Sequence, residues 1–304
     1  MLRIDWHRIK GYAPLCFITL GIVLWRVTAP FAVILPWIIS AMLFFAVLNM
    51  PLRAVAPRPK HLVLLALHLG LGGGLYLLLS LWNPLIATSL FMCFLATAAT
   101  AAGAMTSLME GDTGFATGYT ILTHGLICFL APFLLPLLDD HSQLPFWTLS
   151  GQIALLVARM VILPITLAWL VRYLMKRRGR TPGPHRTLTY WLWLSSLIFI
   201  LGNAVAFVSE EGGGNPLLLV ASFGVGFLAC ALQFTLGPPL SRWIGVEEVA
   251  CRQAMGQKNT ALTLWLCISF MHPLVAPGIA GYIAWQNFFL TYYMNRYLRQ
   301  STSS

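Results

Sequence analysis

The sequence predicts an all-α polytopic membrane protein with about ten transmembrane helices. Of its 304 residues, 58% are hydrophobic and 9% are charged, whereas soluble domains carry roughly 25% charged residues. Apolar runs long enough to cross a bilayer recur along the chain, with short polar segments between them. Lysine and arginine gather in every second polar segment, as the positive-inside rule describes. Together these observations indicate that lipid is the solvent for much of the chain.

We expect one helix in each apolar run. The predicted helices span residues 11–28, 30–49, 61–81, 84–109, 114–138, 150–174, 188–208, 216–240, 247–270 and 273–295. Two longer polar segments interrupt the series: residues 51–60 are rich in proline and arginine, and residues 176–186 in glycine, proline and basic residues. The basic N-terminal segment leads straight into the first run, which we interpret as a retained helix rather than a cleaved signal peptide.

The charged residues alternate between the two ends of the predicted helices. One end carries Arg3, Arg8, Lys10, Arg53, Arg58, Lys60, Arg172, Lys176, Arg177, Arg178, Arg180, Arg186, Arg242, Arg252, Arg296 and Arg299. The opposite loops carry Arg26, Asp139, Asp140, Glu210 and Glu211. We therefore expect a multi-pass protein of the plasma membrane, of the bacterial inner-membrane kind, with both termini cytoplasmic. This distribution explains the net charge of +10 without a nucleic-acid partner.

Ten runs divide into two sets of five. Because five is odd, the second set enters the membrane from the opposite side, which predicts an inverted-topology repeat. Residues 1–175 then hold the first repeat together with helix 6 of the second repeat. Residues 176–304 hold the remainder of the second repeat.

The fourth run of each set is interrupted in a corresponding place. Residues 97–104, which include Thr100 and Gly103, contain no large side chain, and residues 254–260 form a polar patch around Lys258. Corresponding interruptions in two halves indicate a central binding site. Irregular backbone at membrane depth is tolerated only inside protein or beside a cavity. The alternative for residues 97–104 is that small residues merely let helices pack closely.

Several motifs resemble the bile acid:sodium symporter family. Met105-Thr106-Ser107-Leu108-Met109-Glu110-Gly111-Asp112 is similar to the family's segment after the helix-four crossing, and Ala131-Pro132-Phe133-Leu134-Leu135-Pro136-Leu137-Leu138 to the end of its fifth helix. Gly256 and Asn259 fit its helix-nine crossing motif, with a matching spacing back to His61. The resemblance covers most of the first half and the helix-nine region.

The resemblance implies a fold and an activity. Helices 4 and 9 would be broken and would cross each other inside a core domain formed by residues 61–138 and 216–295. Residues 11–49 and 150–208 would form a panel domain beside it. Members of the family carry bile acids, other organic anions or related small acids by alternating access, usually together with sodium.

The chain departs from the family at the positions that bind sodium. The aligned residues are Leu65, Ala102, Gly103, Ala116, Thr120, Ala254 and Lys258. Of these, Thr120 keeps a side-chain oxygen, and a cation replaces a family ligand at Lys258. We therefore expect transport that is independent of sodium, with Lys258 in place of the ion, and we expect no metal site and no cofactor.

Two cations lie deep in the apolar runs, whereas no acidic residue does. A lysine at membrane depth costs roughly 2.5–3.5 kcal/mol, so Lys258 is a candidate functional residue. Arg159 lies about midway through the sixth run. An anionic substrate would serve both as counter-ion. The alternatives are that Lys258 caps half-helix carbonyls and that backbone carbonyls satisfy the guanidinium of Arg159.

Other polar residues give weaker signals. We interpret His68 and His124 as neutral structural histidines, with a role in proton relay as the alternative. We interpret the six cysteines as small buried hydrophobic residues. The sequence contains no nucleophile motif, no HExxH zinc motif and no paired buried carboxylates, so we do not expect an enzyme.

The sequence therefore predicts a secondary transporter of a small or amphipathic organic anion, working in the lipid bilayer. The residues predicted to bind the substrate are Lys258, Asn259, Gln257, Arg159, Thr120, Thr100 and Gly103. The alternatives are a proton-coupled carrier that uses Lys258 or a histidine, and a membrane sensor or assembly protein that does not transport.

Overall fold

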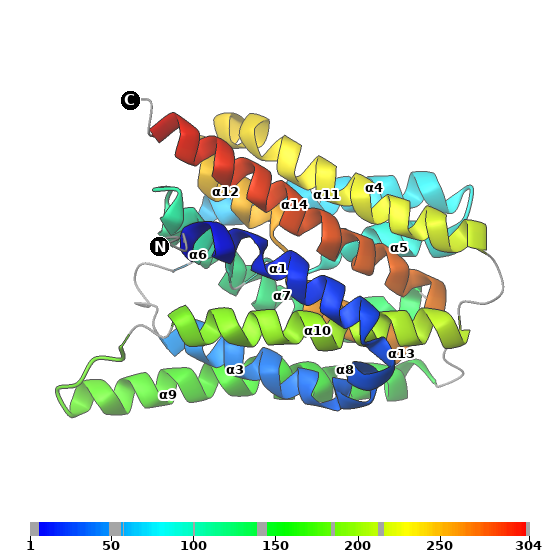
Figure 1. Cartoon of the computed structure of the whole chain (residues 1–304), viewed down its shortest axis with the longest axis horizontal. Helices are drawn as coiled ribbons and strands as arrows, with labels where there is room; N and C mark the ends of the chain where they lie inside the picture. The colour runs from blue at the N-terminus through cyan, green and yellow to red at the C-terminus, as the bar shows by residue number, and fades with distance from the viewer. Residues whose placement is uncertain are drawn as a thin grey trace, which may run out of the picture.

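The computed structural model describes residues 6–48, 56, 58–99, 101–138, 145–183, 186–211 and 216–301 (Figure 1). These residues form helices and no strands. The helices are α1 (Trp6–Val23), α2 (Trp25–Thr28), η1 (Ala29–Ile34), α3 (Leu35–Leu48), α4 (Pro59–Ser80), α5 (Pro84–Leu95), α6 (Ala101–Leu108), α7 (Thr113–Leu138), α8 (Phe146–Val157), η2 (Ala158–Ile162), α9 (Leu163–Arg177), α10 (Arg186–Glu211), α11 (Pro216–Ile244), α12 (Glu248–Gly256), α13 (Thr260–Phe270), η3 (Pro273–Val275) and α14 (Ala276–Ser301).

Several helices have the length and apolar composition of a membrane span. Three uninterrupted segments qualify among the described residues: Trp25–Phe45, Pro59–Ser80 and Pro216–Ile244. A fourth candidate joins Thr113–Ile127 to Phe129–Leu138 across a bend of 58°. Pro132 accounts for this bend, because its ring displaces the carbonyl four residues earlier and it lacks the amide hydrogen for that bond. The chain is an all-α membrane protein.

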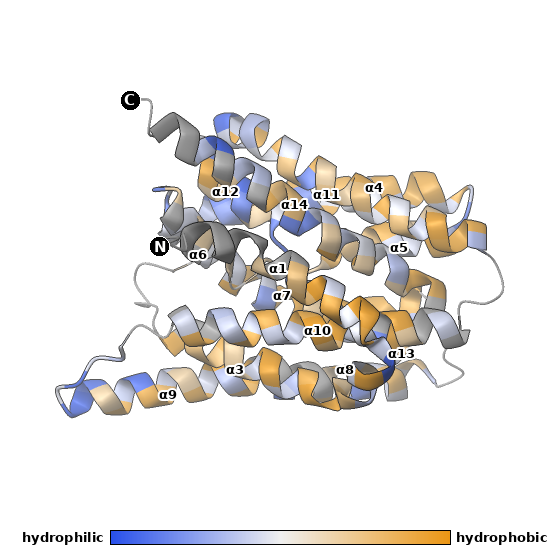
Figure 2. Cartoon of the chain, viewed as in Figure 1, coloured by the Kyte–Doolittle hydropathy of each residue, from blue (hydrophilic) through white to orange (hydrophobic). Residues whose placement is uncertain are grey.

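The outer surface fits this conclusion. Large apolar side chains are exposed along the helices, with Leu81 86% exposed and Trp37 76% exposed. A soluble protein rarely exposes so much contiguous apolar surface, whereas lipid tails cover it without cost. Figure 2 shows that the hydrophobic colour extends along most helices, while hydrophilic residues gather at the end of the bundle where both termini lie.

Helical structure is present in each predicted apolar run, but the first boundary differs from the prediction. The helix is interrupted at Leu24 instead of near residue 29, and α1 already begins at Trp6. Leu24 is flanked by Val23 and Trp25, so no glycine or proline directly beside it marks this break. The expectation that all cysteines are buried is also wrong at Cys16, which is exposed. The ten membrane crossings and the inverted repeat remain predictions.

The helices pack in two groups. In the first, α1 and α3 pack on α10, and α3 also packs on α9. In the second, α11 packs on α5, α12 and α14, while α4 packs on α5. Helices α11 and α14 approach each other closely, since a Cβ on Gly226 would meet the backbone oxygen of Gly278. Glycine is required there because any side chain would push the two helices apart.

Polar contacts tie the second group together at the end that carries the termini. Arg58 forms a salt bridge of 3.2 Å with Asp112, and Lys60 donates to the carbonyl oxygen of Gly245. Glu247 caps α12 by accepting from the amides of Val249 and Ala250. These contacts join α4, α7, α11 and α12, so this end of the group is held rigidly around the interrupted helices.

Candidate functional site

The two predicted interruptions are breaks in the helices, and they cross each other. Helix α5 ends at Leu95 and α6 begins at Ala101, while α12 ends at Gly256 and α13 begins at Thr260. The unwound segments run antiparallel and pair at Ala98 and Lys258. The Ala99 amide donates to the Gln257 carbonyl at 2.8 Å, and the Asn259 amide donates to the Thr97 carbonyl at 2.8 Å.

Side chains satisfy backbone groups that the breaks leave without helical partners. The Ala98 amide donates to the hydroxyl of Thr123 at 3.0 Å. The Lys258 amide donates to the side-chain oxygen of Gln286 at 2.6 Å. Such partners are obligatory at membrane depth, because an unpaired backbone group there costs several kcal/mol. Side chains of α7 and α14 therefore hold the two unwound segments in place at the crossing.

The first residues of two half-helices lie at the crossing. Asn259 caps α13 by accepting from the Leu262 amide at 3.3 Å, and α6 begins two residues after Ala99. The hydroxyl of Thr120 steadies this turn by donating to the Ala99 carbonyl at 3.2 Å. Helix N-termini carry a partial positive charge and amides directed outward, so they attract anions.

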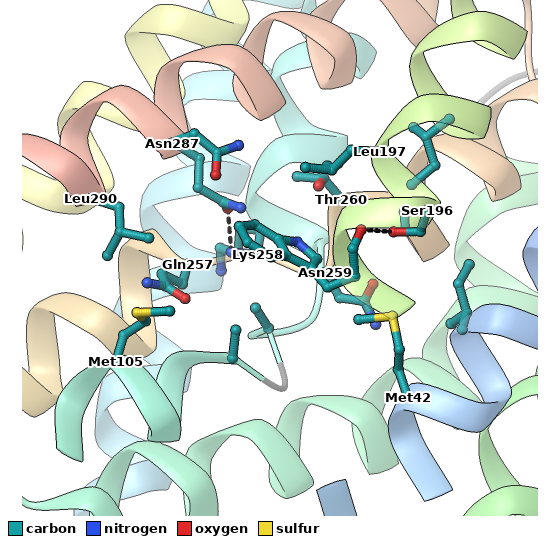
Figure 3. A pocket seen from close by; sticks show the side chains of 17 residues that line it. Met42, Met105, Ser196, Leu197, Gln257, Lys258, Asn259, Thr260, Asn287 and Leu290 are labelled. Atoms are coloured by element: carbon teal, nitrogen blue, oxygen red, sulfur yellow. Dashed lines mark hydrogen bonds between the residues drawn. The ribbon is translucent and has the colours of Figure 1, made fainter. Parts of the chain in front are cut away.

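A cavity of about 40 Å³ adjoins the crossing on the side of the first helix group. Figure 3 shows Met42 of α3 and Ser196 of α10 on one side of it, with Gln257 and Leu290 on the other. Space of this size holds about three water molecules. The cavity therefore lies between the two helix groups, where relative movement of the groups would reshape it.

Gln257 lines this cavity and carries an unpaired donor. Its side-chain nitrogen is buried and has no hydrogen-bond partner among the described residues. A buried amide without a partner is unfavourable by about 1–3 kcal/mol, so a ligand that accepts from it recovers this free energy. Gln257 is the side chain at the cavity that most directly favours an oxygen-bearing ligand.

Lys258 reaches to the opposite side of the crossing. It is 2% exposed, and its Nζ lies 3.0 Å from Nε2 of His68. Nδ1 of His68 lies 3.2 Å from the hydroxyl of Tyr119. These three side chains line a second, smaller cavity of about 10 Å³. Both salt bridges found among the described residues involve other cations, Arg58 and Arg252.

Buried apolar side chains occupy positions where the family resemblance expects sodium ligands. Leu65, Ala116 and Ala254 come together in one hydrophobic cluster with Ala98 and Tyr119. The structure thus brings these distant positions together in one cluster that offers no side-chain oxygen from the three residues. Among the described residues, no group of three or more His, Cys, Asp or Glu side chains could hold a metal ion.

The structure brings some predicted site residues together and separates others. Gln257, Lys258 and Asn259 lie at the crossing, and Thr120 supports it. Gly103 is buried against Thr117 and does not line the larger cavity.

Two further predicted site residues are not found at the crossing. Arg159 lies in the π-helix η2, on an exposed face of the bundle, and therefore does not join Lys258 at either cavity. Thr100 lies outside the described residues.

Two residues of α14 at the site were missed by sequence reasoning. Gln286 supports the Lys258 backbone, and Asn287 lines the larger cavity. The signal that could have found them is an adjacent pair of amides inside the predicted tenth apolar run. Amide pairs at membrane depth are unfavourable unless they bond to other helices or to a cavity.

Comparisons with protein-family models and with curated proteins find no match to this chain. The similarity to the bile acid:sodium symporter family therefore stays a prediction from the motifs quoted above.

Proposed function

We propose that this protein is a secondary transporter that moves a small or amphipathic organic anion across the membrane by alternating access, without sodium. The observation that carries this proposal is the crossing of two broken helices beside a cavity, with two half-helix N-termini and the unpaired amide of Gln257 at its wall. Discontinuous helices that meet at the interface of two helix groups are the usual construction of a transporter binding site.

The charge around the crossing favours an anion. The N-termini of α6 and α13 and the donor of Gln257 all attract negative charge. Lys258 is buried at the crossing, and no carboxylate among the described residues forms a salt bridge with it. An anion bound in the larger cavity would complete this arrangement as the counter-ion.

The position of the cavity favours alternating access. Its walls come from α3 and α10 of one helix group and from the crossing and α14 of the other. We infer that the first group is the panel and the second is the core. A rocking movement of one against the other would expose the crossing to either side of the membrane in turn.

An uptake experiment tests the function directly. Purified protein in proteoliposomes should take up benzenesulfonate, taurocholate or benzoate in a saturable manner, at rates that protein-free liposomes do not reach. Absence of protein-dependent uptake and of binding for all three anions would favour the sensor or assembly protein instead.

The first prediction concerns Gln257. Gln257→Leu removes the buried donor at the cavity and should weaken benzenesulfonate binding roughly 10- to 100-fold, because a hydrogen bond to a charged group contributes about 1.5–3 kcal/mol. Isothermal titration calorimetry in detergent measures the affinity. The matched control is Gln152→Leu, the same chemical change at an exposed position of α8. Equal affinities for the two variants would remove Gln257 from the binding site.

The second prediction concerns orientation. Asp139→Cys and Arg178→Cys, each made in a background without the six native cysteines, should be labelled from opposite sides of the membrane. We expect a membrane-impermeant maleimide to label Asp139→Cys in intact cells and Arg178→Cys only after permeabilisation, because the basic loops are retained in the cytoplasm. Labelling of both positions from one side would contradict the proposed topology.

A further inference from the structure

We propose that Lys258, His68 and Tyr119 form a proton-binding relay that couples movement of the anion to movement of one proton. This inference rests on the proposed transport function and assigns its coupling ion. The three side chains come from three separate parts of the fold: the break after α12, the middle of α4 and the first half of α7. Nζ of Lys258 lies 3.0 Å from Nε2 of His68, and Nδ1 of His68 lies 3.2 Å from the Tyr119 hydroxyl.

The relay has two hydrogen-bond arrangements that differ by one proton. When Lys258 is charged, it donates to Nε2 of His68, and Nδ1 carries a hydrogen that it donates to the Tyr119 oxygen. When Lys258 is neutral, Nε2 of His68 donates to Nζ, and the Tyr119 hydroxyl donates to Nδ1. Both arrangements keep both hydrogen bonds, so gain or loss of the proton leaves neither ring nitrogen without a partner.

Proton release converts the first arrangement into the second with all atoms accounted for. The proton of Nζ passes to Nε2, the hydrogen of Nδ1 passes to the Tyr119 oxygen, and the original hydroxyl proton of Tyr119 passes to water. The smaller cavity, which all three side chains line, has about 10 Å³ of space. That is room for about one water molecule, which is the acceptor at the end of the relay.

The other buried histidines lack this freedom. His124 donates from Nδ1 to the Thr120 carbonyl at 2.8 Å, and its Nε2 accepts from the side-chain nitrogen of Asn259. Nε2 of His61 faces the Phe115 carbonyl at 3.0 Å, and its Nδ1 accepts from the Arg58 amide. A carbonyl can only accept and a backbone amide can only donate, so both rings are fixed in one neutral form. His68 differs because Lys258 and Tyr119, which contact its two ring nitrogens, can each donate or accept; the Gln233 side chain and the Phe94 backbone also lie close to the ring.

The surroundings do not hold the proton on Lys258. The groups around the relay are the thiols of Cys93 on α5, Cys230 on α11 and Cys251 on α12, the hydroxyl of Tyr282 on α14, the ring of His61 on α4 and the side-chain amide of Gln233 on α11. None of them is a carboxylate that would fix an ammonium ion. The anion is then the partner that stabilises the charged form, and binding of each strengthens binding of the other by the same factor.

The experiment uses sulfonates, which stay ionised at every pH tested, so that a pH effect reports on the protein. Proteoliposomes without sodium receive benzenesulfonate or taurocholate under an inward proton gradient of about two pH units. One proton for each anion makes the process electroneutral, so accumulation should approach roughly 100-fold and should not respond to membrane potential. Pyranine trapped inside should report acidification of the lumen as the anion enters.

The variants test the relay itself. Tyr119→Phe removes the hydroxyl alone, and the ratio of gradient-driven uptake to anion exchange should fall about tenfold or more, because exchange needs no proton release. His68→Gln should lower the same ratio and serves as the second variant if Tyr119→Phe fails to fold. The matched control is Tyr76→Phe on α4, which packs against Phe91 and should keep the wild-type ratio.

The outcomes separate the two proposals. If the wild type takes up neither sulfonate under any gradient, the proposed transport function is wrong for this class of anion. If it takes up a sulfonate but shows no response to the proton gradient and no acidification, the transport function stands and the proton relay is refuted. An unchanged ratio in both Tyr119→Phe and His68→Gln also refutes the relay.

Discussion

Replacing all sodium by potassium should leave the uptake of benzenesulfonate unchanged. A sodium ion in the family position would lie next to Lys258, and two unit charges about 4 Å apart at an effective dielectric constant of about 20 repel by about 4 kcal/mol. This repulsion alone lowers sodium affinity by roughly three orders of magnitude. The side chains of Leu65, Ala116 and Ala254 add no oxygen ligands, since they form part of a hydrophobic cluster beside the crossing.

The measurement is the initial rate of uptake at fixed pH in media that differ only in the cation. A matched experiment with lithium or choline separates a specific sodium effect from an effect of ionic strength. Saturable stimulation by sodium would show that Lys258 does not substitute for the ion. It would also show that Leu65, Ala116 and Ala254 do not occupy the positions of the family's sodium ligands.

Gly226→Ala should lower the stability of the protein far more than Gly224→Ala, although the two residues are only two positions apart on α11. A Cβ at Gly226 would meet the backbone of Gly278 and lie 2.8 Å from the amide nitrogen of Tyr282. A Cβ at Gly224 would meet no atom within 4 Å. Overpacking against backbone costs about 1–3 kcal/mol or more, whereas alanine in open helix gains up to about 1 kcal/mol over glycine.

The same substitution should reach the candidate site. Tyr282 lies on α14 opposite Gly226, and its hydroxyl donates to the carbonyl oxygen of Gly256 at 2.7 Å, where α12 breaks. If Gly226→Ala displaces α14, this support of the crossing is lost. Thermal unfolding in detergent should show a midpoint lower by about 5 °C or more for Gly226→Ala and no decrease for Gly224→Ala. Equal midpoints would mean that α11 and α14 are less closely packed than the structure indicates.

Much of the fold follows from composition and from the rules that lipid imposes. A chain with 58% hydrophobic residues and few charges has to place apolar surface against lipid, and only helices satisfy their backbone within one segment there. The all-α class and the positions of the apolar runs follow from these rules. The break at Leu24 does not, because neither Val23 nor Trp25 beside it is a helix-breaking residue.

The candidate site was predictable where small or polar residues interrupt an apolar run. Small residues in the fourth run and Gln257, Lys258 and Asn259 in the ninth run are unusual at membrane depth, and the structure brings these two segments into contact. Arg159 breaks the pattern as well, but it does not reach the site. In a helix that is apolar on all sides, spacing does not reveal which face points inward, and the π-helix at residues 158–162 shifts the register further.

The sequence by itself determined that this is an α-helical membrane protein with two interrupted helices and one lysine among them. Only the tertiary structure decided what that lysine contacts. His68 is 190 residues from Lys258 along the chain, and the two meet because α4 packs beside the crossing. The direction of the ammonium group, away from the larger cavity and toward His68, is likewise a property of the packed helices. Local sequence sets where a helix can form or break, whereas partners across helices depend on rotation and depth, which only packing fixes.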